Sequence, residues 1–233
     1  MLVDVVFGLP RERLERLVVV DVFRSSTAIV KALENGAVEI IPCSSIAEAK
    51  RLKRKLGSNI LLVGERMGIT PKNFDLNISP SLLTRERVEG RRIIYCSTNL
   101  MKVVSRNLDS KLLLIGGLIN ASAVAKYLNR LNPEKITIVA CGLIPDKMIT
   151  MEDVIGAGAI ISRLIDAELT DTAIISRLAY ENDEWRRIIP NSYIANYLRS
   201  IGWGQDIEIC LNEDSSNIVP ILVDGVIKGV RVD

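Results

Sequence analysis

Short apolar runs alternate with segments of helical periodicity along most of this 233-residue chain. The runs are rich in Val, Ile and Leu, which favour strands, and most of them precede apolar residues at helical spacing. Strands are predicted at 18–20, 38–41, 60–63, 92–95, 112–115 and 136–140. Because strands that alternate with helices favour a sheet with helices on both faces, we predict an α/β protein. Its architecture should be a three-layer α/β/α arrangement around a mostly parallel or mixed sheet.

Glycines mark the expected ends of two helices. The helix that follows Asp21 should end at Asn35-Gly36, and the next helix, over 46–56, should end at Gly57, because glycine readily adopts a left-handed conformation. Further helices are predicted over 120–128 and 151–165, and a hairpin turn is predicted at Asp224-Gly225.

The length of the chain allows one large domain or two small ones. Its composition, 48% hydrophobic and 25% charged, is typical of a globular protein with a well-buried core. No linker or short repeat divides the sequence, so we predict a single α/β domain over 1–233. An internal duplication into two similar lobes, divided near 111–117, is the alternative.

The charge balance and the apolar runs limit the expected partners and location. The 30 basic and 28 acidic residues give no broad basic field, so nucleic acid is not an expected partner. The amino terminus does not resemble a signal peptide and no run is long enough to span a bilayer, so a cytoplasmic protein without a membrane partner is predicted. The widely spaced cysteines are expected to be buried free thiols. A homodimer is the default expectation for self-association, although no segment locates an interface.

The chain contains no histidine. This excludes histidine phosphoenzymes, histidine-ligated metals and nucleophiles activated by imidazole. Any chemistry must therefore use carboxylates, hydroxyls, amides, arginines, lysines or an ion with oxygen ligands.

Polar residues gather where the predicted strands end, which is where open α/β sheets bind ligands. After the first predicted strand come Asp21 and Arg24, and then hydroxyls at the start of a helix, at Ser25, Ser26 and Thr27. Helix N-termini, hydroxyls and arginines together favour a phosphate or sulfonate. The structural alternative is that the hydroxyls only cap the helix.

Other predicted strand ends and one long irregular segment carry similar residues. They are Glu65 and Arg66, Asp75 and Asn77, Ser97, Thr98 and Asn99, and Asn120. Carboxylates near phosphate donors favour Mg²⁺, and Glu152 could contribute because a predicted capping box uses only its neighbour Asp153. The loops of cysteine phosphatases and of P-loop nucleotide hydrolases are absent, and Phe23 stands where a haloacid-dehalogenase phosphatase carries its second aspartate.

Motifs in order along the chain resemble those of the 2-phosphosulfolactate phosphatase family. They are DVFRSST at 21–27, GERMG at 64–68, FDLNISP at 74–80, STN at 97–99 and GLINA at 117–121. The similarity continues through Glu152-Asp153 and Gly204-Gln205-Asp206-Ile207, so it covers essentially the whole chain.

The resemblance implies a magnesium-dependent acid phosphatase that converts 2-phospho-3-sulfolactate and water to 3-sulfolactate and phosphate, in coenzyme M biosynthesis. Combined with the chemistry of the residues, it predicts catalytic roles for Asp21, Arg24 and Arg66. Asp21, Glu65 and Glu152 are predicted to hold Mg²⁺. The predicted substrate-binding residues are Ser25, Ser26, Thr27, Asp75, Asn77, Ser97, Thr98, Asn99 and Asn120.

Three positions depart from the family's pattern, at Met67, Leu100 and Ile78. Met67 and Leu100 add bulk where a glycine would let the backbone approach a ligand. Two alternatives therefore stay open: a family member that acts on another small phosphoester, and a non-catalytic anion-binding protein of the same fold. Two routes also stay open for hydrolysis, direct attack by a metal-bound water and an aspartyl-phosphate on Asp21.

Overall fold

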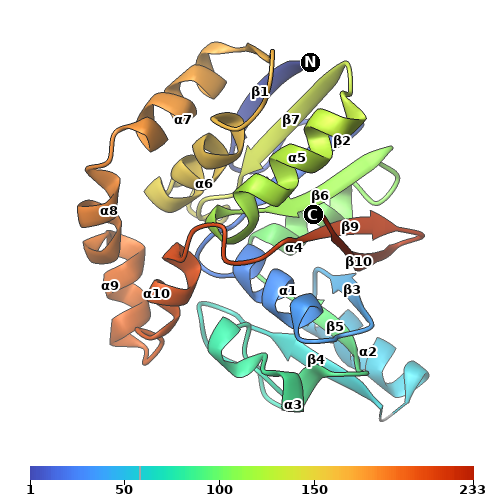
Figure 1. Ribbon diagram of the computed structural model, residues 1–233. Coiled ribbons are helices and arrows are strands. Elements are labelled where there is room, and N and C mark those ends of the chain that lie inside the picture. The colour runs from blue at the N-terminus through green and yellow to red at the C-terminus, as the bar shows by residue number, and fades with distance from the viewer. Residues whose placement is uncertain (58) are drawn as a thin grey trace.

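The centre of this computed structural model, which describes residues 1–57 and 59–233, is a mixed sheet. Its ten strands among the described residues are β1 (Leu2–Phe7), β2 (Arg16–Val20), β3 (Glu39–Cys43), β4 (Ile60–Gly64), β5 (Arg92–Cys96), β6 (Leu112–Gly116), β7 (Lys135–Ala140), β8 (Glu168–Leu169), β9 (Ile218–Val223) and β10 (Val226–Arg231). Their order across the sheet is β4-β5-β3-β10-β9-β6-β2-β7-β1-β8 (Figure 1). All six predicted strands are present, as β2 to β7.

The α-helices of the described chain connect and cover these strands. They are α1 (Ser25–Glu34), α2 (Ile46–Leu56), α3 (Arg85–Val88), α4 (Leu100–Arg106), α5 (Ala121–Leu131), α6 (Met151–Ile161), α7 (Asp171–Glu181), α8 (Trp185–Ile188), α9 (Tyr193–Ser200) and α10 (Asp206–Leu211). The predicted ends of α1 and α2 are confirmed, with Gly36 at φ 94° and Gly57 at φ 91°. The hairpin turn at Asp224-Gly225 is also confirmed, between β9 and β10.

Helix α6 ends four residues earlier than the sequence predicts, at Ile161 rather than at 165. Ser162 Oγ donates a hydrogen bond to the Ala159 carbonyl at 2.9 Å, and Arg163 Nη1 donates to the same oxygen at 2.6 Å. Side chains thus satisfy a carbonyl that another helical turn would have used, so the helix can stop.

The predicted three-layer α/β/α arrangement is confirmed by the way alternate residues of β2 pack. Leu17 and Val19 belong to one apolar core, which contains residues of α1 and α4. Val18 and Val20 point to the opposite face and pack in a second core with residues of α5 and α6. Because successive side chains of a strand point to opposite faces, this central strand is buried on both sides.

The sheet consists of two parallel blocks that run in opposite directions. Strands β1, β2, β6, β7 and β8 are mutually parallel, and so are β3, β4 and β5. The hairpin β9–β10 joins them through three antiparallel pairings, β6 with β9, β9 with β10 and β10 with β3. An odd number of antiparallel steps reverses the strand direction. The sequence predicts a parallel or mixed sheet but not this division.

Strands β1 and β8 are absent from the sequence prediction. Asp4 interrupts the apolar run of β1, which hides its strand character. In the structure the Asp4 carboxylate accepts hydrogen bonds from Thr170 Oγ1 at 2.8 Å and from Thr172 Oγ1 at 3.2 Å, so the charge is satisfied beside the sheet. Strand β8 has only two residues, too few for a periodic signal.

Other sequence expectations have mixed outcomes. The four cysteines are buried free thiols, as predicted. Across the part of the chain that the structure describes, no helix is long and apolar enough to cross a membrane. The region 111–117, where a division into two lobes was the alternative, contains strand β6, which pairs with β2. The single domain and the two-lobe arrangement both stay predictions. The described residues do not show a duplication.

Gly158 allows helices α6 and α7 to pack closely. A Cβ at this position would overlap the Ser176 carbonyl oxygen and approach Tyr180 Cβ to 2.8 Å. We expect Gly158→Ala to lower the free energy of unfolding by about 1–3 kcal/mol, because a packed core tolerates an added methyl group poorly. Urea unfolding followed by circular dichroism would measure the change. Gly204→Ala is the matched control, since its Cβ would meet the flexible side chain of Arg199; equal losses in both variants would contradict the packing argument.

Candidate active site

A pocket of about 320 Å³ brings together residues that follow strands of both parallel blocks. Asp21 follows β2, in one block, and Glu65 follows β4, in the other. The predicted site residues that line the pocket are Asp21, Arg24, Ser25, Glu65, Thr98 and Asn99. The sequence therefore identifies residues that lie close together in the structure. They follow strands of two parallel blocks that run in opposite directions, and not strands of one parallel sheet.

Asp21 lines this pocket and is only 4% exposed. Burial, with a contribution from the nearby charge of Glu65, raises its pKa to about 6 despite hydrogen bonds from Ser25 that lower it. The Ser25 N–H points at Asp21 Oδ1 from 3.5 Å. Two carboxyl groups in one small pocket without a neutralising lysine are a high-energy arrangement that favours a cation.

Glu65 holds the two loops that surround it. Its Oε1 accepts a hydrogen bond from the Thr98 N–H at 2.6 Å, and its Oε2 accepts one from the Gly68 N–H at 2.9 Å. Both carboxylate oxygens of Glu65 therefore accept hydrogen bonds from backbone N–H groups beside the pocket. The Thr98 hydroxyl is buried and has no hydrogen-bond partner among the described residues.

Arg24 forms a buried ion pair at the base of the pocket. Its Nη1 lies 2.7 Å from Asp206 Oδ2, its Nη2 donates to Asn77 Oδ1 at 3.0 Å, and its guanidinium lies 5.1 Å from the ring centroid of Trp203. Asp206 Oδ1 accepts a further hydrogen bond from Ser79 Oγ at 2.7 Å. Much of the hydrogen-bonding capacity of Arg24 is thus used within the protein, so its main contribution is a fixed, partly neutralised charge.

Asp206 is a site residue that the sequence analysis missed. It was noted only as part of the resemblance, because no local pattern connects it with Arg24 across 182 positions. Its carboxylate is fully buried, and burial of an unpaired acid would be costly. Asp206 is the first residue of α10, and an acid at a helix N-terminus is ordinarily a favourable charge there, so its position alone does not indicate a role in the site.

Three of the predicted hydroxyl ligands lie outside the pocket lining and bond to the backbone. Ser26 Oγ accepts a hydrogen bond from the Asp21 N–H at 2.9 Å, and Thr27 Oγ1 donates to the Val22 carbonyl at 3.3 Å. Ser97 Oγ accepts a weak hydrogen bond from the Met101 N–H at 3.4 Å, in the first turn of α4. Of these three, Ser97 fits the structural alternative, in which a hydroxyl caps a helix start, whereas Ser26 and Thr27 lie within α1, whose N-cap has no side-chain hydrogen bond.

Arg66, predicted to be catalytic, also lies outside the lining. Its Nη1 donates to the Glu65 carbonyl at 2.6 Å, and its Nη2 lies 3.0 Å from the Ser44 carbonyl oxygen and 3.1 Å from Cys96 Sγ. This arginine therefore fixes the loop that carries Glu65. The positive charge of Arg66 can still influence the electrostatic potential in the pocket, because Arg66 is adjacent to Glu65.

Asp75 and Asn120 are placed away from the pocket as well. Asp75 Oδ2 accepts from the Leu62 N–H at 2.7 Å and pairs with Lys53 at 3.1 Å, beside the edge strand β4. Asn120 is buried, accepts from the Gly117 N–H at 3.1 Å and donates to the Ile218 carbonyl at 2.9 Å. Both side chains therefore join segments of the backbone.

The two remaining asparagines support the pocket in different ways. Asn77 lies behind the lining, where its Nδ2 donates to the Gly68 carbonyl at 3.0 Å while its Oδ1 accepts from Arg24. Asn99 lines the pocket, and its Oδ1 accepts from the Ile144 N–H at 3.1 Å. Asn99 thus ties the loop after β7 to the rim.

Two of the three predicted magnesium ligands line the pocket, where water and substrate oxygens could complete a magnesium site. Asp21 and Glu65 line the pocket, while Glu152 is buried outside the lining, and no described residue bonds to its Oε2 atom. Burial, with a smaller contribution from the charge of Asp21, raises the pKa of Glu152 to about 7. Within residues 1–57 and 59–233, no group of three acidic or cysteine side chains could hold a metal ion unaided. Mg²⁺ commonly uses only one or two carboxylates together with water and substrate oxygens.

Two of the three departures from the family's pattern are at the pocket. Met67 and Ile78 line it, and Met67 is 74% exposed at the rim, with φ 51°. Leu100 is fully buried at the start of α4 and lies outside the lining. The residues most able to reshape the pocket are therefore Met67 and Ile78.

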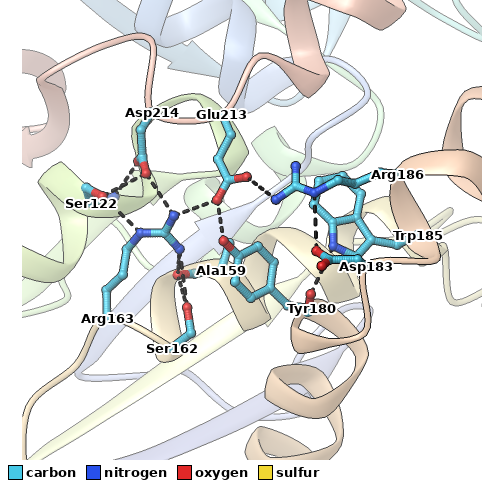
Figure 2. Close-up of polar contacts among 10 residues, drawn as sticks. All are labelled: Ser122, Ala159, Ser162, Arg163, Tyr180, Asp183, Trp185, Arg186, Glu213 and Asp214. Atoms are coloured by element: carbon cyan, nitrogen blue, oxygen red, sulfur yellow. Dashed lines mark hydrogen bonds and ion pairs between the residues drawn. The ribbon is translucent and has the colours of Figure 1, made fainter.

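A second polar network holds the segment directly after α10 (Figure 2). Arg163 Nη2 lies 2.5 Å from Glu213 Oε1 and 2.8 Å from Asp214 Oδ2, and Arg186 Nη2 lies 2.9 Å from Glu213 Oε2. The Tyr180 hydroxyl donates to the same glutamate. This network connects α6, α7 and α8 to the chain that follows α10, and it therefore stabilises the position of the helix that carries Asp206.

We expect Asp206→Asn to lower the free energy of unfolding by about 3–5 kcal/mol, because it leaves the buried Arg24 charge without its acidic partner. Urea unfolding monitored by fluorescence of the neighbouring Trp203 would measure the loss. Asp109→Asn is the control, since it removes the acid of an exposed ion pair with Arg13 and should leave the urea midpoint unchanged. Equal midpoints for both variants would contradict a stabilising role for the buried pair.

Comparison with known proteins agrees with the resemblance described above. Residues 8–225 match the family described as 2-phosphosulpholactate phosphatase. A protein of Thermotoga petrophila named probable 2-phosphosulfolactate phosphatase is 38% identical over 211 residues, which cover 90% of this chain and 89% of the relative.

Two further relatives carry the same name. The protein of Carboxydothermus hydrogenoformans is 37% identical over 226 residues, with 94% of this chain and 92% of the relative covered. The protein of Clostridium beijerinckii is 33% identical over 221 residues, with 92% of each chain covered. Since the match extends over nearly the full length of the pocket-forming fold, the chain belongs to the 2-phosphosulpholactate phosphatase family.

Proposed function

We propose that this phosphatase hydrolyses 2-phosphosulfolactate to sulfolactate and phosphate in a reaction that depends on magnesium. The observation that carries the proposal is the placement of two acidic side chains, Asp21 and Glu65, in one pocket with hydroxyl-bearing Ser25 and Thr98. The substrate is inferred from relatives that are named probable 2-phosphosulfolactate phosphatase. A role for this protein in coenzyme M biosynthesis is inferred only from the identity of that substrate.

The residues of the pocket supply the groups that hydrolysis of a phosphomonoester requires. The oxygen of water forms a bond to phosphorus while the bond to the alcohol oxygen breaks, and the alcohol oxygen takes up a proton. Asp21 would orient the water and accept the proton that it releases, because its carboxylate lines the pocket beside Ser25 and Glu65. Ser25 and the unpartnered Thr98 hydroxyl would donate hydrogen bonds to phosphoryl oxygens.

Asp21 and Glu65 would hold magnesium together with water and substrate, and Glu152 would add negative charge from behind Asp21. When bound, magnesium supplies positive charge that neutralises phosphoryl oxygens and lowers the pKa of a coordinated water. The protein itself offers little free positive charge, because Arg24 is paired with Asp206. This shortage supports a cation as part of the site.

The decisive experiment measures phosphate release from 2-phosphosulfolactate by the purified protein. We expect release with added Mg²⁺, loss of release after removal of divalent cations with a chelator, and recovery when Mg²⁺ is returned. Activity that persists unchanged in the chelator would remove magnesium from the proposal. No release under any of these conditions would favour the non-catalytic alternative.

Asp21→Asn should lower kcat by about 10²-fold or more, because both direct water attack and a phosphorylated Asp21 need this carboxylate. The variant should fold, since it preserves the shape of the side chain, and circular dichroism would confirm this. Asp75→Asn is the matched control. Its carboxylate contacts Leu62 and Lys53 outside the pocket, so kcat/KM should stay within a few-fold of the wild-type value. Wild-type turnover by Asp21→Asn would exclude Asp21 from the chemistry.

A further inference from the structure

Two of the buried cysteines lie side by side at the ends of neighbouring strands. Cys43 is the last residue of β3, Cys96 is the last residue of β5, and the two are paired in the parallel ladder (Figure 1). Both belong to the same small apolar core, so their side chains point to the same face of the sheet. Neighbouring strands are about 4.8 Å apart, and disulfides join residues whose Cα atoms are about 4.4–6.8 Å apart. The backbone therefore holds the two residues at a separation that a disulfide can bridge.

The side chain of Arg66 contacts the sulfur of Cys96. Its Nη2 atom lies 3.1 Å from Cys96 Sγ and 3.0 Å from the Ser44 carbonyl oxygen. The neighbouring Cys43 thiol and the charge of Arg66 lower the pKa of Cys96 to about 7. A thiol beside a guanidinium ionises more readily, and the thiolate is the form that reacts with oxidants. Cys96 is therefore the more reactive member of the pair.

The sulfur of Cys43 contacts residues at the protein surface. Its Sγ lies 3.2 Å from the Ser45 carbonyl oxygen and 3.3 Å from Glu48 Oε2, so its S–H can donate to either. Ser45 is exposed and Glu48 is half-buried. A small local opening at the start of α2 would therefore expose the pair to a molecule as small as hydrogen peroxide. The Glu48 carboxylate also offers a place for the proton that Cys43 gives up on oxidation.

The cysteine pair is connected to the candidate active site through Glu65. The Cys96 carbonyl oxygen accepts a hydrogen bond from the Glu65 N–H at 3.0 Å, and Arg66 Nη1 donates to the Glu65 carbonyl at 2.6 Å. The Thr98 N–H, in the loop that follows Cys96, donates to Glu65 Oε1 at 2.6 Å. A covalent bond at Cys96 Sγ would remove this sulfur from its contact with Arg66 and displace the chain segments that position Glu65.

We propose that Cys43 and Cys96 are an oxidisable pair that a peroxide converts to a disulfide and a dithiol restores, and that the disulfide weakens magnesium binding at Glu65. Formation of the bond is independent of the proposed function, whereas its effect on magnesium rests on that function.

The peroxide balances the reaction. The Cys96 thiolate attacks one peroxide oxygen, the O–O bond breaks, and the departing hydroxide takes up the proton that Cys96 has lost, which leaves a sulfenic acid and one water. The Cys43 sulfur then attacks the Cys96 sulfur, the S–O bond breaks, and the second hydroxide takes up the proton of Cys43. Two thiols are oxidised by two electrons in total, and the peroxide is reduced to two water molecules. Two thiols of a dithiol return the electrons and protons and become a disulfide themselves.

Treatment of the folded protein with hydrogen peroxide tests the formation of the bond. We expect the number of free thiols, counted after denaturation, to fall from four to two. Mass spectrometry of a non-reduced tryptic digest should then show peptides 32–50 and 93–102 joined to each other. Dithiothreitol should separate the two peptides and restore the thiols.

Variants assign the bond to this pair. Cys43→Ala and Cys96→Ala should each abolish the cross-link, and circular dichroism would confirm that both variants fold. Cys210→Ala is the matched control, because Cys210 is equally buried but belongs to a different apolar core. This variant should form the cross-link as the wild-type protein does.

Titration calorimetry with Mg²⁺ on the reduced and the oxidised protein measures the effect on the site. We expect the Kd for Mg²⁺ to rise about tenfold on oxidation, as it does when a group that orients a metal ligand is lost, and to recover with dithiothreitol. The Mg²⁺ concentration that gives half-maximal phosphate release from 2-phosphosulfolactate should rise in parallel.

The outcomes separate this inference from the proposed function. Survival of all the thiols in peroxide, a cross-link that forms only after unfolding in urea, or a cross-link that leaves the Kd for Mg²⁺ unchanged overturns the inference. Phosphate release by the reduced protein would leave the proposed function standing in each of these cases. A cross-link and a shifted Kd in a protein that releases no phosphate when reduced would overturn the proposed function alone.

Discussion

The buried ion pair between Arg24 and Asp206 is the contact on which the pocket depends. It joins the start of α1 to the start of α10, and through Asn77 and Ser79 it also fixes the segment after β4. Both charges are buried, so each is tolerable only while the other is present. The position of α10 therefore determines whether Arg24 remains at the base of the pocket, and the network around Arg163 and Glu213 secures α10 from its far end (Figure 2).

The same shortage of free positive charge bears on the chemistry proposed for the site. With Arg24 neutralised and Arg66 bonded to backbone and sulfur, the carboxylates of Asp21 and Glu65 are left without a full protein counter-charge. This shortage of counter-charge is the physical basis for the divalent cation in the proposed function.

Local patterns in the sequence predict much of the fold and part of the site. Apolar runs and glycine stops locate β2 to β7 and the ends of α1 and α2, because these features depend on neighbours in the chain. Strand ends also locate Asp21, Glu65 and Thr98. What the sequence could not provide was the reversal between the parallel blocks and the pairing of Arg24 with Asp206, since both arise from contacts between distant segments. The same limit applies to Ser26 and Asn120, whose backbone partners become visible only in three dimensions.

The position of the β9–β10 hairpin has a consequence for how the protein is made. This hairpin follows every other strand in the sequence, yet it lies in the middle of the sheet, between β6 and β3 (Figure 1). During synthesis both parallel blocks leave the ribosome before the segment that joins them. Until the hairpin pairs, β6 and β3 each present an open edge that can associate with other chains. Nascent chains that stall before residue 218 should therefore be the form of this protein that most needs a chaperone.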